Sequence, residues 1–547
     1  IWLVILWSKK YFQIKEAINK MPSNLFLKLD DSNNIIFVLL GLILSSIVFR
    51  FIYFPYEIPI FLDSIEYFNY AFQISQTGNL PSEYFPNNGW PTFLSLFFSV
   101  LDKNNFFEFV YMQRSIAIII SSITIVPIFF LCKKFVETKY AIITGIIFTF
   151  SPRLVLNSIQ GLTEPLTIFL FSMTLMLLFT NKIKYTFAAF SMASLLVLVR
   201  SETLLIIIPL SIIFFIKHKK ESRVFLKFII VISIFLLILT PMIYLRIEAT
   251  GQDGLTSQFG GGLSHMSQHV ISEISQTEDT YPEEWQNNKL ENFLTRAITS
   301  LIKFVGFALF PGLILFVLLG TVLVTKKWKK IMKDYRTLSL ILFVPFLAIP
   351  ILYAYGRGIE ESRYIFILFP ILIIPVTYAV KKITSKNYKI ISLFIILFIL
   401  ISSLLFIEYK KMDYNHEKEL FLISKDIINL TEVINADPID GNYLTVAKIL
   451  QKWPNMELQT SDKKFKYSSK EFDSINEFII KNKGLGLSHI VTDGKDHNSK
   501  FITDIFYTNS KYPYLTKIYD STEKGYEYKV IIFKINNKKF LEKVNKN

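Results

Sequence analysis

Long apolar runs separated by short polar segments cover the first three quarters of this chain. Most runs approach the ~20 residues that an α-helix needs to cross the ~30 Å hydrocarbon core of a bilayer. The pattern predicts about eleven transmembrane helices, near residues 35–54, 115–132, 140–157, 164–180, 185–199, 203–217, 224–245, 298–323, 337–355, 364–380 and 388–407. We therefore expect a polytopic α-helical membrane protein.

The polar segments between these runs alternate in charge. Lysine and arginine gather in every second segment, a pattern that marks cytoplasmic loops. These basic segments are 9–28, 133–139, 182–184, 217–227, 326–336 and 381–389. The alternation predicts a cytoplasmic N-terminal segment at 1–34, outer loops at 55–114 and 246–297, and an extracytoplasmic C-terminus. Because the first residue is Ile1 rather than Met, we expect the chain to begin part way through a longer product.

The tail at 408–547 lacks the long apolar runs. Residues 471–481 have helical spacing, and the patterns at residues 487–492 and 529–535 are typical of strands. The segment 522–525 ends in glycine between two strand-like stretches, which indicates a hairpin connection. The tail is therefore predicted to be a soluble α/β domain that follows a membrane domain at 35–407.

Composition restricts the classes of partner and site. The formal charge of +15 invites a nucleic-acid interpretation, but the basic residues lie in the loops between apolar runs, so the expected partner is the lipid bilayer and not nucleic acid. The single cysteine, Cys132, excludes intramolecular disulfides and zinc sites built from several cysteines.

Charged residues interrupt the predicted outer face at four places. A charge at membrane depth costs several kcal/mol unless it is paired or lines a wet cavity. Their recurrence at one face therefore predicts a shared polar pocket, although each residue could instead be an interfacial anchor that reaches to water. The four clusters are Asp63 with Glu66, Arg153 with Glu164, Arg200 with Glu202, and Glu360 and Glu361 with Arg363.

Several segments around these charges resemble a known family. They are Asp63-Ser64-Ile65-Glu66-Tyr67, Gly89-Trp90-Pro91, Ser151-Pro152-Arg153, Leu162-Thr163-Glu164-Pro165, Val199-Arg200-Ser201-Glu202 and Glu361-Ser362-Arg363-Tyr364. In order and spacing they resemble GT-C glycosyltransferases of the protein O-mannosyltransferase and aminoarabinose transferase group. The resemblance covers residues 35–407. It implies a GT-C-like catalytic membrane domain that moves a sugar from a polyprenyl-phosphate donor to a hydroxyl of a protein, lipid or glycan on the outer membrane face. Direct displacement would invert the anomeric carbon.

The resemblance also implies roles for individual residues. Asp63 matches the family's first acidic position and would be the base that accepts the hydroxyl proton. Many relatives carry a second acid directly after it, whereas this chain has Ser64 and then Glu66 one helical turn away. Glu66 could replace that acid or be a solvated helix residue. Arg153, Arg200 and Arg363 would bind the donor phosphate. Supporting residues of the polar pocket would be Glu164, Glu202, Glu361 and Tyr364.

Three alternatives remain open at the level of sequence. Oligosaccharyltransferases of the same superfamily typically carry a Trp pair in the soluble domain, and the sequence has none. A transporter or lipid flippase could use the same polar pocket without chemistry, and an inactive relative could act as a scaffold. No cofactor is certain. A divalent metal is possible, because His265, His269 and Glu273 recur every four residues, as would also occur on a polar surface helix.

Overall fold

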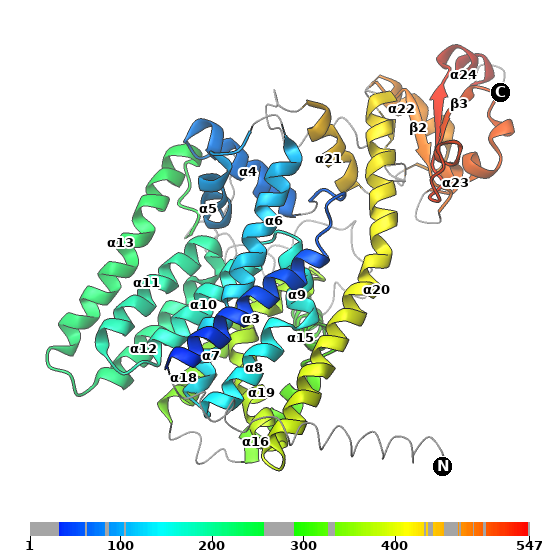
Figure 1. The fold of residues 1–547 in the computed structure, drawn as a ribbon. Coiled ribbons are helices and arrows are strands. Elements are labelled where there is room, and N and C mark those ends of the chain that lie inside the picture. Colours follow the sequence, from blue (N-terminus) through cyan, green and yellow to red (C-terminus); the bar gives the residue numbers. More distant parts are fainter. Residues whose placement is uncertain are drawn as a thin grey trace, which may run out of the picture. The chain divides into compact units, whose positions relative to one another are not determined.

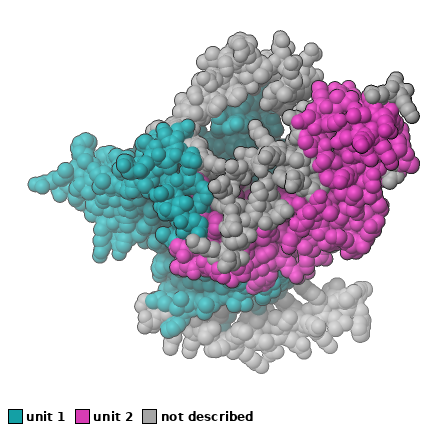
Figure 2. All heavy atoms as spheres, turned by 90° about the horizontal axis from the view of Figure 1, so that it is seen from above, with its two compact units in different colours: residues 1–54, 73–96, 113–407 teal, residues 55–72, 97–112, 408–547 magenta. Residues whose placement is uncertain are grey.

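The computed structural model describes residues 32–60, 63–82, 87–102, 105–255, 289–326, 334–430, 434–435, 441–452, 469, 472–484, 486–495 and 499–544. The chain divides into two compact units (Figure 2). Unit 1 comprises residues 1–54, 73–96 and 113–407, and unit 2 comprises residues 55–72, 97–112 and 408–547. Each unit is described by itself.

Helices make up nearly all of the described part of the chain before residue 430 (Figure 1). In chain order they are α3 (Ser32–Ile52), α4 (Asp63–Thr77), α5 (Gly89–Phe98), α6 (Phe106–Ile123), α7 (Ile125–Lys133), α8 (Thr138–Thr149), α9 (Pro152–Ile159), α10 (Glu164–Leu178), α11 (Ile183–Val199), the 3₁₀ helix η2 (Ser201–Ile206), α12 (Ile207–His218), α13 (Val224–Thr250), α15 (Lys289–Leu309), α16 (Ile314–Lys326), α18 (Tyr335–Gly356), the 3₁₀ helix η4 (Ser362–Leu368), α19 (Phe369–Thr384) and α20 (Tyr388–Leu430).

The helices confirm the predicted multi-pass membrane fold. Among the described residues, eight helical segments are long and apolar enough to cross a bilayer, or nine when the bent pair α8 and α9 is taken as one span. Three shorter apolar helices, α10, α11 and α16, accompany them.

Several predicted helices have other bounds in the structure, and two of these differences have a clear physical reason. The predicted helix at 298–323 is two helices, because α15 ends at Leu309 and α16 begins at Ile314. Pro311 lacks the N–H that a continuous helix needs, and Gly312 is a poor helix former. The predicted helix at 388–407 continues to Leu430 as α20, because the lysine and glutamate residues that follow its apolar part also favour helix.

Unit 1 is a bundle of closely packed helices. In Figure 1, α10, α11 and α13 run side by side, and the contacts between them agree. A second close pair is α16 and α19, where a Cβ at Gly320 would lie 1.9 Å from the backbone oxygen of Pro375. Small residues that let backbones approach in this way are typical of helix packing in membranes.

A buried arginine ties four helices of unit 1 together. The guanidinium of Arg50, in α3, donates to Ser158 Oγ in α9 at 3.0 Å, to the backbone oxygen of Thr149 in α8 at 2.9 Å and to Ser121 Oγ in α6 at 3.2 Å. It also donates to the hydroxyl of Ser46 one turn earlier in α3. Neutral acceptors therefore satisfy a cation that is fully buried.

Unit 2 contains the predicted α/β tail. Its elements are β1 (Ile434–Asn435), α21 (Gly441–Lys452), α22 (Ile475–Lys483), β2 (His489–Thr492), α23 (Lys500–Tyr507), the 3₁₀ helix η6 (Asn509–Lys511), β3 (Leu515–Asp520), the 3₁₀ helix η7 (Ser521–Lys524), β4 (Ile531–Ile535) and α24 (Asn537–Val544). The sheet order is β1-β2-β4-β3, with β1 parallel to β2 and the other neighbours antiparallel. The helix predicted at 471–481, both predicted strands and the hairpin with its positive-φ Gly525 are confirmed.

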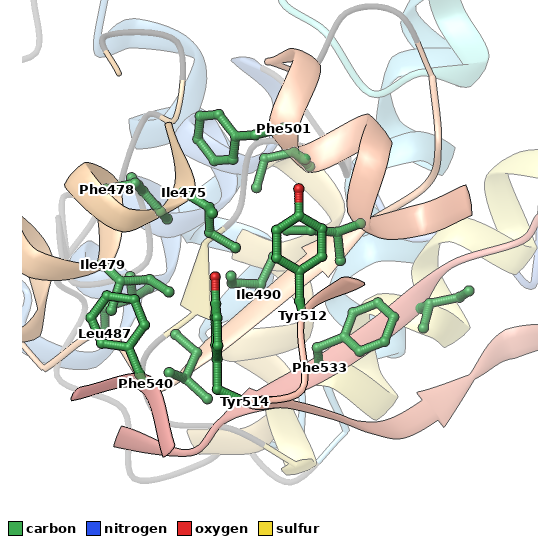
Figure 3. Packing of buried hydrophobic residues seen from close by; sticks show 14 residues of the cluster. Ile475, Phe478, Ile479, Leu487, Ile490, Phe501, Tyr512, Tyr514, Phe533 and Phe540 are labelled. Carbon is green, nitrogen blue, oxygen red and sulfur yellow. The ribbon is translucent and has the colours of Figure 1, made fainter. Parts of the chain in front are cut away.

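The tail has its own hydrophobic core, shown in Figure 3. Phe478 of α22 and Ile490 of β2 are fully buried there, together with Phe533 of β4 and Phe540 of α24. Tyr519 of β3 also donates to the Asp426 carboxylate in the last part of α20 at 3.1 Å. The sheet and the end of α20 therefore belong to one folded unit.

Candidate functional site

Helix breaks in unit 1 carry most of the residues that the sequence singled out. Ser151-Pro152 separates α8 from α9 by a bend of 50°, since the residue before a proline disfavours helix and proline suits a first helical position. Gly161, at φ +73°, ends the next turn, so that Glu164 begins α10. The extended backbone of Arg200 separates α11 from η2.

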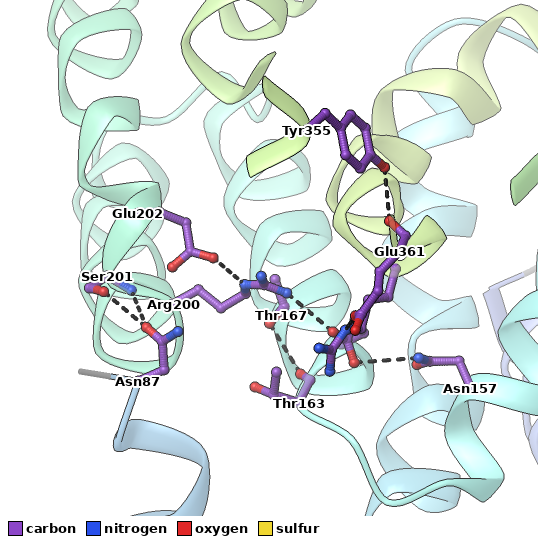
Figure 4. A network of polar contacts seen from close by, with 11 residues as sticks. Asn87, Asn157, Thr163, Thr167, Arg200, Ser201, Glu202, Tyr355 and Glu361 are labelled. Atoms are coloured by element: carbon purple, nitrogen blue, oxygen red, sulfur yellow. Dashed lines mark hydrogen bonds and ion pairs between the residues drawn. The ribbon is translucent and has the colours of Figure 1, made fainter. Parts of the chain in front are cut away.

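Glu164 and Arg200 form the centre of a polar network, shown in Figure 4. Arg200 Nη1 lies 3.2 Å from Glu164 Oε1, and Arg200 Nε lies 2.7 Å from Glu202 Oε1. Asn157 of α9 donates to the second oxygen of Glu164 at 3.4 Å. The Glu164 side chain is only 2% exposed and that of Arg200 11%, so the Glu164 carboxylate depends mainly on the Arg200 guanidinium to compensate its charge.

A tyrosine joins this network to a second arginine. The ring of Tyr364 in η4 lies 5.4 Å from the guanidinium carbon of Arg200 and 5.8 Å from that of Arg363, both within the range of cation–π contact. Arg363 forms an ion pair with Glu361, whose side chain is 43% exposed. Unit 1 therefore brings together six of the predicted residues: Glu164, Arg200, Glu202, Glu361, Arg363 and Tyr364.

Arg153 has different surroundings. Its guanidinium stacks on the ring of Phe406 at 4.6 Å, and its Nε donates to the backbone oxygen of Phe310 at 3.4 Å. Within the described part of the chain it makes no ion pair. Because Arg153 and Asn157 are four residues apart in α9, they lie on the same side of that helix. Arg153 is thus a half-buried cation that has no carboxylate partner among the described residues. It lies on α9, the helix from which Asn157 contacts Glu164.

Sequence reasoning missed the segment that braces Arg200. Asn87 Oδ1 accepts from the backbone N–H and the hydroxyl of Ser201, at 3.0 and 2.9 Å. The next residue, Asn88, accepts from Arg246 Nε at 2.9 Å, at the end of α13. At Gly89, a Cβ would lie 2.4 Å from the Leu198 backbone oxygen. The available sequence signal for this segment was a glycine preceded by two polar residues. Gly89 itself belongs to the Gly89-Trp90-Pro91 segment that resembles the family.

The two candidate catalytic acids belong to unit 2. Asp63 and Glu66 both lie in the first turn of α4, where a negative charge is favoured by the helix dipole. Asp63 is partly exposed and Glu66 is exposed. Farther along the helix, Phe68 and Phe72 pack into an aromatic cluster with Phe109 of α6. The helical spacing expected for the two acids is therefore present.

The described residues contain no group of three potential ligands that could hold a metal ion. The weak candidates His265, His269 and Glu273 lie outside the described residues.

Solved structures of other proteins resemble this one in fold. No family model and no curated protein matches the sequence. The oligosaccharyltransferase of Archaeoglobus fulgidus, in a complex with zinc and sulfate, matches with a TM-score of 0.51 and 13% identity over 84% of this chain and 68% of its own. ArnT from Cupriavidus metallidurans, bound to undecaprenyl phosphate, matches with a TM-score of 0.51 and 9% identity over 92% of this chain and 98% of its own. The chain is therefore similar in fold to GT-C membrane glycosyltransferases, as its motifs predicted.

Proposed function

We propose that this protein is a membrane glycosyltransferase that moves a sugar from a polyprenyl-phosphate donor to a hydroxyl acceptor on the outer membrane face. The observation that carries the proposal is the gathering of arginine and acidic side chains at helix breaks of unit 1, in a fold similar to that of ArnT. The structure of ArnT contains undecaprenyl phosphate. A protein–lipid phosphate contact of the same kind is proposed for this chain.

The surroundings of the three arginines suggest different roles for them. Arg153, without a carboxylate partner among the described residues, is the strongest candidate to hold the donor phosphate, because a phosphate would supply its missing anion. Arg363 is the second, since its partner Glu361 is nearly half exposed and water can solvate that carboxylate when a phosphate takes its place. Arg200 is held between two acids, and we assign it mainly to holding Glu164 and Glu202 in position.

The proposed reaction is a direct displacement. The acceptor oxygen forms a bond to the anomeric carbon as the bond from that carbon to the phosphate oxygen breaks, and the lipid phosphate leaves with the bonding electrons. Asp63 would accept the hydroxyl proton, and Glu66 would orient the acceptor. These two roles rest on the family resemblance alone. Direct displacement on this path inverts the configuration at the anomeric carbon.

The test is sugar transfer by the purified protein in lipid nanodiscs, with labelled polyprenyl-phosphate sugars as donors. We expect Arg153→Met to raise the KM for the donor about 10- to 100-fold, as for the loss of one charge-assisted hydrogen bond of about 1.5–3 kcal/mol. Arg223→Met is the matched control, since this arginine is exposed in the turn before α13. Asp63→Asn should abolish transfer and leave donor binding unchanged.

Two results would contradict the proposal. Equal donor KM values in Arg153→Met and wild type would remove Arg153 from the phosphate site. Donor binding without transfer by the wild type, with every donor sugar and with protein, lipid and glycan acceptors, would favour a transporter or a lipid flippase instead.

A further inference from the structure

Unit 2 contains a groove that has no part in the proposed chemistry. It lies between α20, around residues 415–422, and the segment 526–528 that precedes β4, and its cavity volume is about 610 Å³. This volume falls within the ~300–1,000 Å³ range of small-molecule sites. The side chains that matter for its chemistry are Asn415, His416, Lys418, Glu419, Tyr526 and Tyr528.

The walls of this groove are held in place by contacts between its own lining residues and by an ion pair. The two carboxylate oxygens of Glu419 accept from the backbone N–H groups of Glu527 and Tyr528, at 3.2 and 3.0 Å. Lys418 forms an ion pair with Glu57. A wall that is fixed before binding loses little entropy when a ligand enters, which favours affinity.

Tyr528 is the most firmly held of the aromatic side chains. Its hydroxyl donates to the Asp493 carboxylate, and the Lys495 ammonium lies over its ring at 4.5 Å. The His416 ring stands almost perpendicular to it, at an interplanar angle of 88° and a centroid distance of 5.0 Å. His416 and Tyr528 thus form a right-angled corner in the groove, and Tyr526 adds a third ring to the lining.

The lining indicates the chemical class of the ligand. One lysine and two glutamates give it no strong charge of either sign, which disfavours a phosphate, a polyanion or a cationic peptide. Leu422 is the only aliphatic residue among the described lining residues, so an acyl chain would bury little apolar area. An amide both donates to and accepts from hydroxyls, a neutral imidazole does the same through its two nitrogens, carboxylate oxygens accept from them, and aromatic faces pack against C–H groups. A neutral polyhydroxyl ligand uses all of these features.

We propose that this groove binds neutral sugar units, and that the acceptor of the proposed transfer is therefore a glycan. The first part concerns the groove alone, and the second rests on the proposed function. In this assignment Asn415 hydrogen-bonds a sugar hydroxyl and the Tyr526 ring packs against a sugar face. In this proposal unit 2 selects the acceptor, whereas the arginines of unit 1 bind the donor.

The experiment measures saccharide binding by the full-length protein in nanodiscs without donor lipid. The probes are neutral trisaccharides of hexoses and N-acetylhexosamines, followed by saturation-transfer NMR, with a sialylated trisaccharide and a Ser/Thr-rich peptide for comparison. We expect Tyr526→Ala and Asn415→Ala each to weaken binding of a neutral trisaccharide at least tenfold. Tyr507→Ala is the matched control, because this tyrosine is exposed on α23 and is not one of the residues that line the groove.

Asn415 is exposed on a helix, so Asn415→Ala should leave the fold intact, and an unchanged unfolding midpoint verifies this. In the transfer assay, both groove variants should raise the KM for the acceptor and leave the KM for the donor unchanged.

Several outcomes overturn the inference: no neutral trisaccharide binds the wild type, the variants bind as the wild type does, or the peptide alone binds. Because saccharide binding is measured without donor, failure of this inference is distinguishable from failure of transfer. Binding without transfer would support the sugar site while contradicting the proposed enzyme. Transfer without binding would do the reverse.

Discussion

Replacing Arg200 should destabilise unit 1 more than replacing any other candidate arginine. Arg200→Met would leave the Glu164 carboxylate, 2% exposed, without the cation that lies 3.2 Å from it. Breaking a buried ion pair by removal of one partner costs about 3–5 kcal/mol, because the remaining charge is neither hydrated nor paired. Asn157 still donates one hydrogen bond to Glu164, which does not neutralise the charge. We therefore expect the free energy of unfolding to fall by about 3 kcal/mol or more.

A second substitution separates charge from packing. In Arg200→Met/Glu164→Gln no buried carboxylate remains at position 164, and the glutamine side chain can still accept from Asn157. The double variant should therefore regain the stability lost at Glu164, giving a coupling free energy of about 2 kcal/mol or more between the two positions. The cost at Glu202, whose side chain is 26% exposed, remains in both variants. The assay is unfolding in mixed micelles followed by tryptophan fluorescence, with transfer activity measured on the same preparations.

The Lys303–Glu360 pair provides the control. Its side chains are 48% and 54% exposed, so Lys303→Met should change stability by less than about 1 kcal/mol. If Arg200→Met were no less stable than Lys303→Met, the network would not be holding a buried charge, and this reasoning would be refuted. If the double variant were as unstable as the single one, packing of the Arg200 side chain and not its charge would be responsible.

Three further predictions concern other parts of the chain. Gly89→Ala should lower thermal stability and sugar transfer together, because a Cβ would lie 2.4 Å from the Leu198 backbone oxygen and would displace Asn87, which accepts from Ser201. Gly41→Ala is the control and should change neither, because a Cβ at Gly41 meets open space. Arg50→Met should destabilise unit 1 by about 1–3 kcal/mol in the unfolding assay, because its buried acceptors lose their donor; a neutral result would mean that the helices close around the gap. Burial, and then the charge of Lys534, lowers the pKa of His489 in the folded tail. Below the ordinary histidine pKa of about 6.5 the unfolded tail therefore binds more protons than the folded one, and the hydrogen-exchange protection of β2 should fall as the pH drops from 7 to 5. Constant protection over this interval would contradict this prediction.

Much of the fold could be predicted because its signals are local. A run of about twenty apolar residues is specified by membrane thickness and requires no knowledge of the neighbouring helices. The strands of the tail and its Gly525 turn were predictable for the same reason. The break between α15 and α16 was missed because hydropathy alone does not register the loss of a backbone donor at Pro311. The extension of α20 was missed because polar helix formers end an apolar run without ending the helix.

Six members of the polar network could be named from the sequence, but their pairing could not. Charges within apolar sequence indicated that Glu164, Arg200 and Glu202 matter, because burial of a charge always needs a compensating group. The sequence could not say which acid each arginine contacts, since those pairs join residues such as 164 and 200 across separate helices. Asn87, which braces Ser201, carries no charge and gave no such signal.

The difference among the arginines has a consequence for how a lipid-linked donor could be held. A cation between a buried and a partly exposed acid, as at Arg200, cannot take up a phosphate without leaving a carboxylate unpaired. A cation on an aromatic ring, as at Arg153 on Phe406, gains a full charge partner when the phosphate arrives and gives up no ion pair within the described residues. The free energy of donor binding should therefore depend most on Arg153. Because helix α9 lies between the breaks at Pro152 and Gly161, it carries both Arg153 and Asn157, the residue that donates a hydrogen bond to Glu164.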